Sequence, residues 1–364
     1  MFHFDQNTIS IDHKKLSNYG AKILTKAGFK KENADMTANS LVLSNLFGHE
    51  SHGIVQVDNY LRQLENKDLK PNASFTIINE TPAITHADGD KGLGYVQMPK
   101  LLDNLIPKAK KLGTATGSLK NSGHVGRIGE WVEYAAHHGL CAMVTVNDNG
   151  AVLAVAPPGG KKACTSTNPI AVSIPLEDNS YFAFDFSTSN VAIGKIYLAY
   201  LSEKEVPAGL LQDHNGEATT NPDVLFKSPK GSLKPFGDSQ SYKGFGLSVF
   251  VDCLTAGLSG GLTPKENSKD NPLVNNVIVQ LWDPSHFAGL EHMQQQASKY
   301  LDFIKKIPLI NDQKPIRIAG QRALQEKQKR EKDGVPLSIG SIKKLNVHAN
   351  CFDVDIPEEF REII

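Results

Sequence analysis

Two short segments carry histidines between glycines, and these are the side chains best suited to acid-base chemistry. The first segment, GHESHG at residues 48–53, contains His49 and His52. The second, NSGHVGRIG at residues 121–129, contains His124. Imidazole exchanges protons near neutral pH, and flanking glycines let the backbone turn sharply and let a substrate approach closely. We therefore predict that the two segments meet at one active site, although a lone corner histidine such as His52 more often has only a structural role.

The elements expected around the first segment are helices. Apolar side chains recur at helical spacing over residues 12–27 and 32–47, and again from Val57 onward. The histidines of the first segment would thus lie at a corner between helices, where rigid elements can hold a catalytic loop in place.

The character of the chain changes after residue 74. β-Branched residues predict strands, beginning with a hairpin whose turn lies near residues 88–90. Further strands and helices follow without steady β-α-β alternation, which favours an α+β fold. Asp185 is expected at a strand end, followed by Ser187, Thr188 and Ser189 at the start of a helix. Hydroxyls and free N–H groups at a helix start can bind an anion.

Composition limits the classes of partner. The 364 residues include 39 basic and 39 acidic side chains, so the formal net charge is zero and no general attraction to nucleic acid or anionic membrane is expected. The first residues lack an apolar core of signal-peptide length. The four cysteines are scattered singly, with no CxxC pair. These features predict a cytoplasmic, reduced protein without structural zinc.

Three other motifs are weaker. The spacing of His49 and His52 is one residue short of the HExxH zinc motif. GLGYVQ at residues 92–97 lacks the third glycine of the dinucleotide fingerprint, so a Rossmann domain is disfavoured. GLSGG at residues 257–261 matches GxSxG, but its serine follows a predicted helix instead of a strand.

Taken together, seven segments in order resemble the type-2 malate/L-lactate dehydrogenase family, which also includes ureidoglycolate, sulfolactate and diketogulonate oxidoreductases. The segments are SHGIVQVDNYL, ADGDKGLGYVQ, NSGHVGRIGEW, TSTNPIAVSIP, DFSTSNVAIGKI, YKGFGLSVFVDCLTAGLSGG and RIAGQRA. They cover about residues 10 to 335.

The resemblance implies an α+β fold in which NAD or NADP binds to a mostly antiparallel, non-Rossmann sheet domain. It implies a helical domain built from N- and C-terminal segments, and a homodimer with the active site near its interface. The expected units are a helical unit at 1–74, a cofactor-binding unit at 75–310 (with 120–139 packing on the helical unit) and a C-terminal segment at 311–364. The implied reaction is hydride transfer between NAD(P) and a small 2-hydroxy or 2-oxo acid.

The resemblance also implies site residues. His52 and His124 match the family's catalytic histidines, and one of them would exchange the substrate's hydroxyl proton. Ser51 is expected to contact substrate. The positions that match cofactor contacts are Asn168, Asp185, Ser187, Thr188, Ser189, Tyr242, Lys243, Gly320 and Gln321.

The sequence departs from the family where the substrate carboxylate is usually held. Two positions that often carry arginine are Gln56 and Asn59, and a neutral amide cannot replace a bidentate guanidinium. We expect Arg127 to take this role, since one helical turn after His124 would put both side chains on one face. The family's PGE is here AGQ at residues 319–321. A non-catalytic or atypical-substrate relative and, less favoured, a zinc hydrolase therefore stay as alternatives.

Overall fold

The computed structural model describes residues 8–266, 270–310 and 315–361. Its centre is a seven-stranded sheet in the order β2-β3-β4-β11-β5-β6-β7, in which only the β3–β4 pair is parallel. The strands are β2 (Thr76–Glu80), β3 (Ile84–Asp88), β4 (Thr114–Ser122), β5 (Cys141–Asn147), β6 (Ile170–Pro175), β7 (Tyr181–Phe186) and β11 (Asn275–Trp282). The expected mixed fold with a mostly antiparallel sheet is confirmed at this level.

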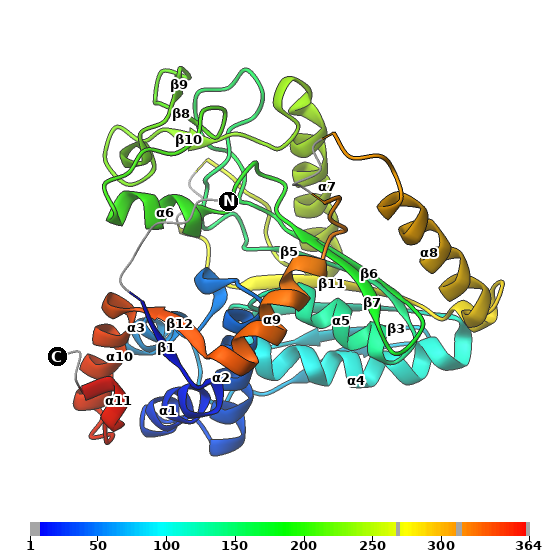
Figure 1. The fold of residues 1–364 in the computed structure, drawn as a ribbon, viewed down its shortest axis with the longest axis horizontal. Coiled ribbons are helices and arrows are strands. Elements are labelled where there is room, and N and C mark those ends of the chain that lie inside the picture. The colour runs from blue at the N-terminus through cyan, green and yellow to red at the C-terminus, as the bar shows by residue number, and fades with distance from the viewer. Residues whose placement is uncertain (1–7, 267–269, 311–314, 362–364) are drawn as a thin grey trace.

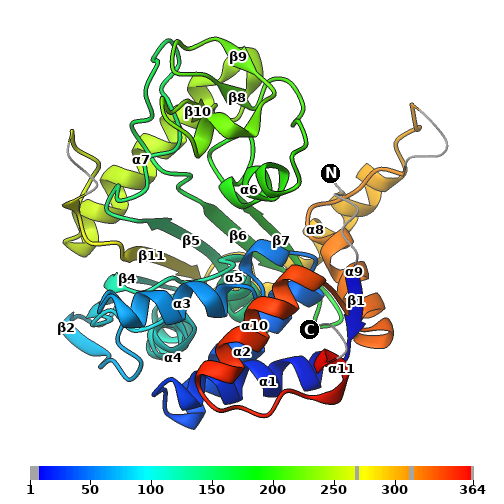
Figure 2. The same ribbon diagram turned by 90° about the vertical axis from the view of Figure 1, so that its left-hand side faces the viewer.

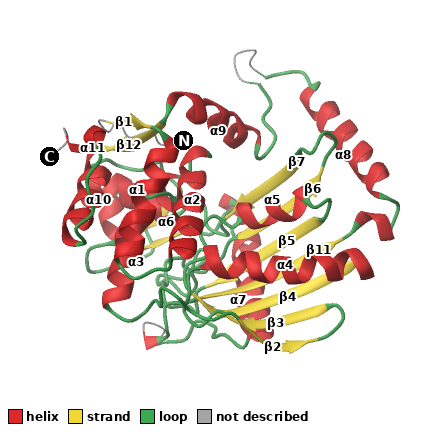
Figure 3. Ribbon diagram, turned by 90° about the horizontal axis from the view of Figure 1, so that it is seen from below, coloured by secondary structure: helices red, strands yellow, loops and turns green. Residues whose placement is uncertain are grey.

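Helices cover both faces of this sheet (Figures 1 and 3). One face carries α4 (Gly94–Leu112) and α5 (Gly129–His137), and the other carries α7 (Tyr242–Ser259). Helix α4 packs closely because Gly117 of β4 has no side chain: an added Cβ would lie 2.4 Å from a methyl of Leu105. The apolar residues of the middle strand, such as Val277 and Leu281, are fully buried between the helical layers.

The two ends of the described chain lie together at one side of the sheet (Figures 1 and 2). Strand β1 (Thr8–Ile11) pairs antiparallel with β12 (Val335–Ser338). The helices here are α1 (His13–Lys26), α2 (Lys31–Leu46), α3 (Gln56–Glu65), α9 (Gln321–Asp333), α10 (Ile339–Cys351) and α11 (Glu358–Arg361). The hydroxyl of Tyr19 donates to Asn346 across 327 positions of sequence.

The remaining elements form a small lobe and an outer helix. The lobe contains α6 (Ile193–Leu201), β8 (Leu211–Gln212), β9 (Ala218–Thr219) and β10 (Ser232–Leu233), and it lies above the sheet in Figure 2. Its own apolar core includes Ile196, Leu211 and Leu233. Helix α8 (Leu290–Lys305) lies at the far end of the sheet, beside β6 and β7. The expected domain boundary at 74/75 stays a prediction, and the one at 310/311 falls beside residues outside the described ranges.

Several sequence predictions about local structure were wrong. The hairpin turn lies between β2 and β3, at residues 81–83, and residues 88–90 follow the second strand. Asp185 lies at the end of β7, as expected, but α6 begins only at Ile193, so Ser187, Thr188 and Ser189 occupy a loop instead of a helix start. Residues 124–127 form neither helix nor strand, Gly126 has φ +71°, and no helical turn joins His124 to Arg127. Strand β12 and helix α10 were not predicted.

Candidate active site

The GHESHG corner connects α2 to α3 through one 3-10 turn, η1 (Glu50–His52). The side chain of Asn45, at the end of α2, accepts from the backbone N–H of Ile54 at 2.8 Å. Gly53 makes this closure possible, because an added Cβ would lie 2.3 Å from the Asn45 amide. Gln56 donates from its amide to the carbonyl of Ser51 at 2.6 Å. The corner is therefore fixed from both of its helices.

The second histidine segment runs from the end of β4 to the start of α5. Its backbone is held on both sides: Gly94 donates to the carbonyl of His124 at 3.0 Å, and Val125 donates to the side chain of Asn275 at 3.0 Å. The indole N–H of Trp131 donates to the carbonyl of Val125 at 2.8 Å. These bonds fix the direction in which the His124 ring leaves the backbone.

The two segments meet, and their imidazoles face each other. The ring centroids of His52 and His124 are 5.7 Å apart with an interplanar angle of 23°. Nδ1 of His52 lies 3.1 Å from the hydroxyl of Ser51, and Nδ1 of His124 lies 2.7 Å from the hydroxyl of Tyr60. No Nε2 partner for either ring is found in the described residues, and neither Nε2 atom is sealed from solvent. Both Nε2 atoms can therefore reach a bound molecule.

Burial keeps these histidines neutral. It lowers the pKa of His52 to about 4, with a smaller contribution from the positive charge of Arg127. Burial likewise lowers the pKa of His124 to about 3, helped by the neighbouring His52. Burial also lowers the pKa of His49 to about 3. Electrostatic repulsion from nearby basic side chains lowers it further; these are Arg127, His52, Arg322 and Lys195. Near neutral pH each ring can accept a proton, as a general base must.

Arg127 lies in an ion pair instead of pointing freely into the site. Its two terminal nitrogens donate to the two carboxylate oxygens of Glu133 at 2.8 and 2.7 Å. Its guanidinium carbon lies 4.4 Å from the ring centre of Phe47, and the side chain is only 5% exposed. A role for Arg127 in holding a substrate carboxylate stays a prediction, and it would require Glu133 to give up this bidentate contact.

Two further carboxyl groups surround this arginine. Asp185 accepts from the backbone N–H of Gly129 at 2.8 Å, which joins β7 to the start of α5. Burial raises the pKa of Asp185 to about 6 and that of Glu130 to about 7, while Arg127 opposes both shifts. Asp185 is therefore part of a buried charge network beside the second histidine segment.

The loop with the three hydroxyls borders the GHESHG corner. An added Cβ at Gly194, in the first turn of α6, would lie 2.8 Å from the Cβ of Ser51. The hydroxyl of Ser189 donates to the carbonyl of Val191 at 2.8 Å and lies 3.1 Å from the hydroxyl of Ser187. The structure thus brings Gly194, which follows this loop, directly against the GHESHG corner.

The other predicted cofactor positions cluster behind that loop. Thr188 donates from backbone and side chain to the carbonyl of Thr167, next to Asn168. The start of α7 approaches the same loop, since an added Cβ at Gly244 would lie 2.9 Å from the carbonyl oxygen of Thr188. Tyr242 and Lys243 are exposed on that helix end.

Two observations there fit a ligand site. The side-chain oxygen of Asn168 is buried and has no hydrogen-bond partner in the described ranges, so a ligand donor could satisfy it. Gly320, at φ +84°, stands against β7, where an added Cβ would lie 2.9 Å from the carbonyl of Ala183. Gln321 accepts from the N–H of Ile318 at 3.1 Å and so closes the turn before α9.

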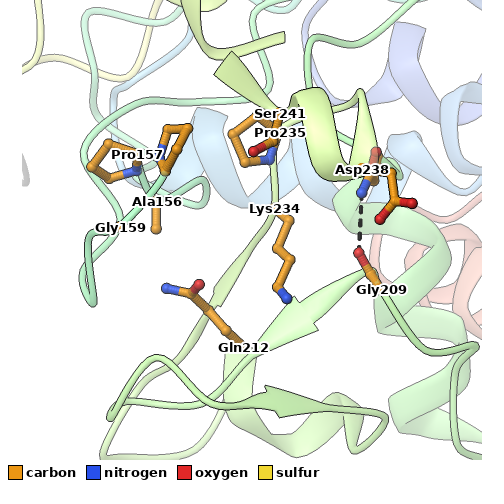
Figure 4. A pocket seen from close by; sticks show the side chains of 11 residues that line it. Ala156, Pro157, Gly159, Gly209, Gln212, Lys234, Pro235, Asp238 and Ser241 are labelled. Carbon is orange, nitrogen blue, oxygen red and sulfur yellow. Dashed lines mark hydrogen bonds between the residues drawn. The ribbon is translucent and has the colours of Figure 1, made fainter. Parts of the chain in front are cut away.

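A cavity of about 210 Å³ adjoins the same loop and the start of α7 (Figure 4). Lys234 points into it, facing Gln212, and Asp238 and Ser241 lie on its other side. Lys234 is half-buried, and no ion pair of this lysine is found in the described part of the chain. An ammonium group in such a cavity is suited to an anionic ligand group.

Comparison with known proteins gives the family. The malate/L-lactate dehydrogenase family matches residues 11–346 of the chain. The chain belongs to this family. Hydroxycarboxylate dehydrogenase B of Escherichia coli K12 is 32% identical over 351 residues, covering 96% of this chain and 95% of that protein. The malate dehydrogenase of Pyrococcus horikoshii is 31% identical over 359 residues, covering 97% and 98%. The solved structure of that malate dehydrogenase superimposes with a TM-score of 0.87 at 29% identity over 98% of this chain and 99% of that one.

Membership of the malate/L-lactate dehydrogenase family confirms the reaction class expected from sequence. The protein is an oxidoreductase that acts on the CH–OH group of a 2-hydroxy acid with NAD or NADP. For the zinc-hydrolase alternative, no group of three His, Cys, Asp or Glu side chains that could hold a metal ion occurs within the described ranges. None of the helices in those ranges combines the length and apolarity that a membrane span requires.

Three residues of this dehydrogenase site were missed from sequence. Tyr60 read as an apolar helix position and Tyr95 as part of a turn, because nothing in their spacing indicates that the Tyr60 hydroxyl would reach His124 or that the Tyr95 hydroxyl would reach Tyr60. Glu133 also read as an ordinary helix residue. Its pairing with Arg127 links a loop residue to a helix residue six positions on, which helical spacing alone does not predict.

Proposed function

We propose that this protein interconverts a small 2-hydroxy acid and its 2-oxo acid, with His52 and His124 on either side of the reacting oxygen. The single observation that carries this proposal is the pair of facing neutral imidazoles, with centroids 5.7 Å apart, next to Ser51 and the loop that precedes α6. Each ring has its Nε2 atom available to a ligand. In the oxidation direction, one imidazole takes the hydroxyl proton while the other donates a hydrogen bond to the same oxygen. The nicotinamide, when bound, accepts the hydride from the substrate carbon.

The substrate carboxylate needs a cation, and we assign it to Lys195. Gln56 cannot serve, because its amide already donates to the carbonyl of Ser51 and its oxygen accepts from Asn59. Lys195 follows Gly194, the residue that abuts Ser51. The side chain of Lys195 is exposed, but partial desolvation and the nearby charge of Arg322 still lower its pKa, as two cations gathered around an anion site would do to each other.

The cofactor would lie along the loop at residues 187–189 and the start of α7. Support comes from the unpartnered oxygen of Asn168, the exposed Lys243 and the approach of Gly320 to β7. This is a non-Rossmann arrangement, because these elements belong to antiparallel strands and their loops instead of a β-α-β crossover. Lys234 would meet a phosphate of the cofactor in the cavity of Figure 4.

We further propose a homodimer in the cytoplasm. The outer face of α7 exposes the apolar side chains of Tyr242, Val249, Phe250 and Leu258. Exposed apolar side chains on one helix suit burial against a second copy of the chain. The thiols support the location, since Cys164, Cys253 and Cys351 are exposed and unpaired.

The test is a screen of reduced-cofactor oxidation followed at the nicotinamide absorbance band. NADH and NADPH are each run against 2-oxo acids with and without a second anionic group. Turnover that falls by about 10²-fold or more in His52→Ala is the expected result. Wild-type turnover in both His52→Ala and His124→Ala would remove these residues from the site.

The alternative is a family member that binds cofactor without turnover, which the missing arginines at Gln56 and Asn59 suggest. It predicts that calorimetry detects NADH or NADPH binding while every oxo acid in the screen stays unreduced. A Lys195→Ala variant separates the two readings: loss of oxo-acid affinity with retained cofactor affinity supports the catalytic one.

A further inference from the structure

The two facing histidines differ in what lies behind them. His52 has Ser51 at its Nδ1, a partly exposed hydroxyl that can donate or accept. His124 has Tyr60 at its Nδ1, and Tyr60 is completely buried on α3. The Tyr60 hydroxyl in turn lies 3.2 Å from the hydroxyl of Tyr95 on α4, which is also buried.

The direction of hydrogen bonding along this chain follows from counting protons. Two hydroxyls and one ring nitrogen share two hydrogen bonds. If Tyr95 donates to Tyr60 and Tyr60 donates to His124, both hydroxyl protons are used. If His124 donates from Nδ1 and Tyr60 donates to Tyr95, the hydroxyl proton of Tyr95 needs another acceptor. Within the described residues its hydroxyl has no hydrogen-bond partner besides Tyr60.

Space around Tyr95 supports the same direction. Its hydroxyl is pressed against Gly126, where an added Cβ would lie 2.5 Å from the oxygen. A buried hydroxyl proton without an acceptor costs free energy, whereas the first arrangement leaves none. Burial also raises the pKa of both tyrosines, so each keeps its proton to donate.

We propose that Tyr60, oriented by Tyr95, is a positioning residue that fixes His124 in the tautomer with the proton on Nε2. This inference rests on the proposed function, since it divides the work between the two histidines. His124 then offers a permanent N–H to the substrate oxygen, and its Nδ1 lone pair is already used. His52 can change tautomer against Ser51, so it is the residue that takes the hydroxyl proton.

This division of roles between His52 and His124 accounts for every proton and electron of the reaction. In oxidation, Nε2 of His52 gains the hydroxyl proton, the C–H electron pair leaves as hydride to the oxidised nicotinamide, and the C–O bond becomes a carbonyl. His124 keeps its proton throughout and only donates a hydrogen bond to that oxygen. Were His124 to release its Nε2 proton, the tyrosine chain would have to supply one and leave a buried phenolate, which burial disfavours.

The first test reads the tautomer directly. Long-range ¹H–¹⁵N correlation spectra of histidine-labelled protein distinguish the Nε2–H from the Nδ1–H form, and the signals of His124 are identified by their loss in His124→Gln. We expect the Nε2–H form in the wild type and a mixture in Tyr60→Phe. The matched control is Tyr19→Phe, which removes another buried hydroxyl, one bonded to Asn346 instead of to Tyr60 or His124, and should leave the spectrum of His124 unchanged.

The second test reads the consequence for catalysis. Glutamine keeps an N–H donor but cannot exchange a proton, so His124→Gln should retain turnover about 10-fold or more above His52→Gln. Tyr60→Phe should lower kcat by about 10-fold, which corresponds to the net contribution of one hydrogen bond, and should leave the cofactor affinity unchanged. Turnover in His52→Gln at or above that in His124→Gln would overturn the division of roles.

An Nδ1–H form of His124 in the wild type, or an unchanged tautomer in Tyr60→Phe, would overturn the positioning role. Because the spectra need no substrate, they decide this point even if the protein turns over no oxo acid.

Discussion

The buried pair of Arg127 and Glu133 allows a prediction about stability. Arg127→Met keeps much of the side-chain volume against Phe47 and removes the charge. The carboxylate of Glu133, which is 9% exposed, then loses both charge-assisted hydrogen bonds. Breaking one half of a buried ion pair costs about 3 to 5 kcal/mol of the free energy of unfolding. Arg127→Met combined with Glu133→Gln should recover at least half of this loss, because no unpaired charge is left at that contact.

The loss of unfolding free energy caused by Arg127→Met should also depend on pH. Arg127 now opposes the raised pKa values of Asp185 and Glu130, so removing it raises both further. A carboxyl group whose pKa is higher in the folded than in the unfolded state binds more protons when folded. Its contribution to stability is therefore lost as pH rises through the folded pKa. The penalty of Arg127→Met should be larger at pH 8 than at pH 5.5.

Urea unfolding followed by circular dichroism, at fixed protein concentration, measures both effects. The cycle of wild type, Arg127→Met, Glu133→Gln and the double variant gives the coupling energy of the pair. A loss below about 1 kcal/mol at both pH values, together with a raised KM for the oxo acid, would refute this reasoning. That outcome would restore Arg127 as the residue that holds the substrate carboxylate.

Three further predictions follow from the histidines, the cavity and the α7 face. Because burial lowers the pKa of His52 to about 4, the wild type should lose about 2 kcal/mol of unfolding free energy through this residue when the pH falls from 8 to 5, and His52→Gln should not. If the difference in unfolding free energy between the two proteins is the same at both pH values, His52 titrates normally. Lys234→Ala should weaken dinucleotide binding about tenfold in calorimetry, while the control Lys230→Ala, at an exposed position, should leave it unchanged. If both variants bind the dinucleotide equally well, the cavity is not part of the cofactor site. Phe250→Asp on the exposed face of α7 should shift the molar mass in light scattering toward the monomer, and an unchanged dimer would exclude this face as the interface.

Sequence patterns predicted well those features that depend on nearby residues. The ranges expected at residues 12–27 and 32–47 match α1 and α2 within one residue at each end, and in α1 an apolar face repeats along the helix. The convergence of His52 with His124 was predicted from the shared chemistry of their two segments and from the resemblance to a family, since no local rule connects residues 72 positions apart.

The features that sequence could not predict depend on tertiary context. Gly126 adopts a left-handed conformation and residues 124–127 form no helix, so the helical-spacing argument for Arg127 fails. Helix α10 lacks a strong amphipathic pattern, and it is stabilised by contacts with α1 and α3 from the other end of the chain. The hydroxyl loop at residues 187–189 precedes its helix by several residues because its side chains bond to their own backbone.

The pairing of β1 with β12, and of the N-terminal helices with α9 and α10, bears on how the active site is formed during synthesis. Arg330 bonds to both Asn45 and Glu50, so the GHESHG corner is braced by a residue 280 positions later than Glu50. His348 bonds to Asp58, two residues before Tyr60, at 2.9 Å. A chain still on the ribosome lacks these braces, and closing such distant contacts is slow. The catalytic corner is thus among the last parts to become rigid, and the partly made protein should not turn over substrate before α9 and α10 have emerged.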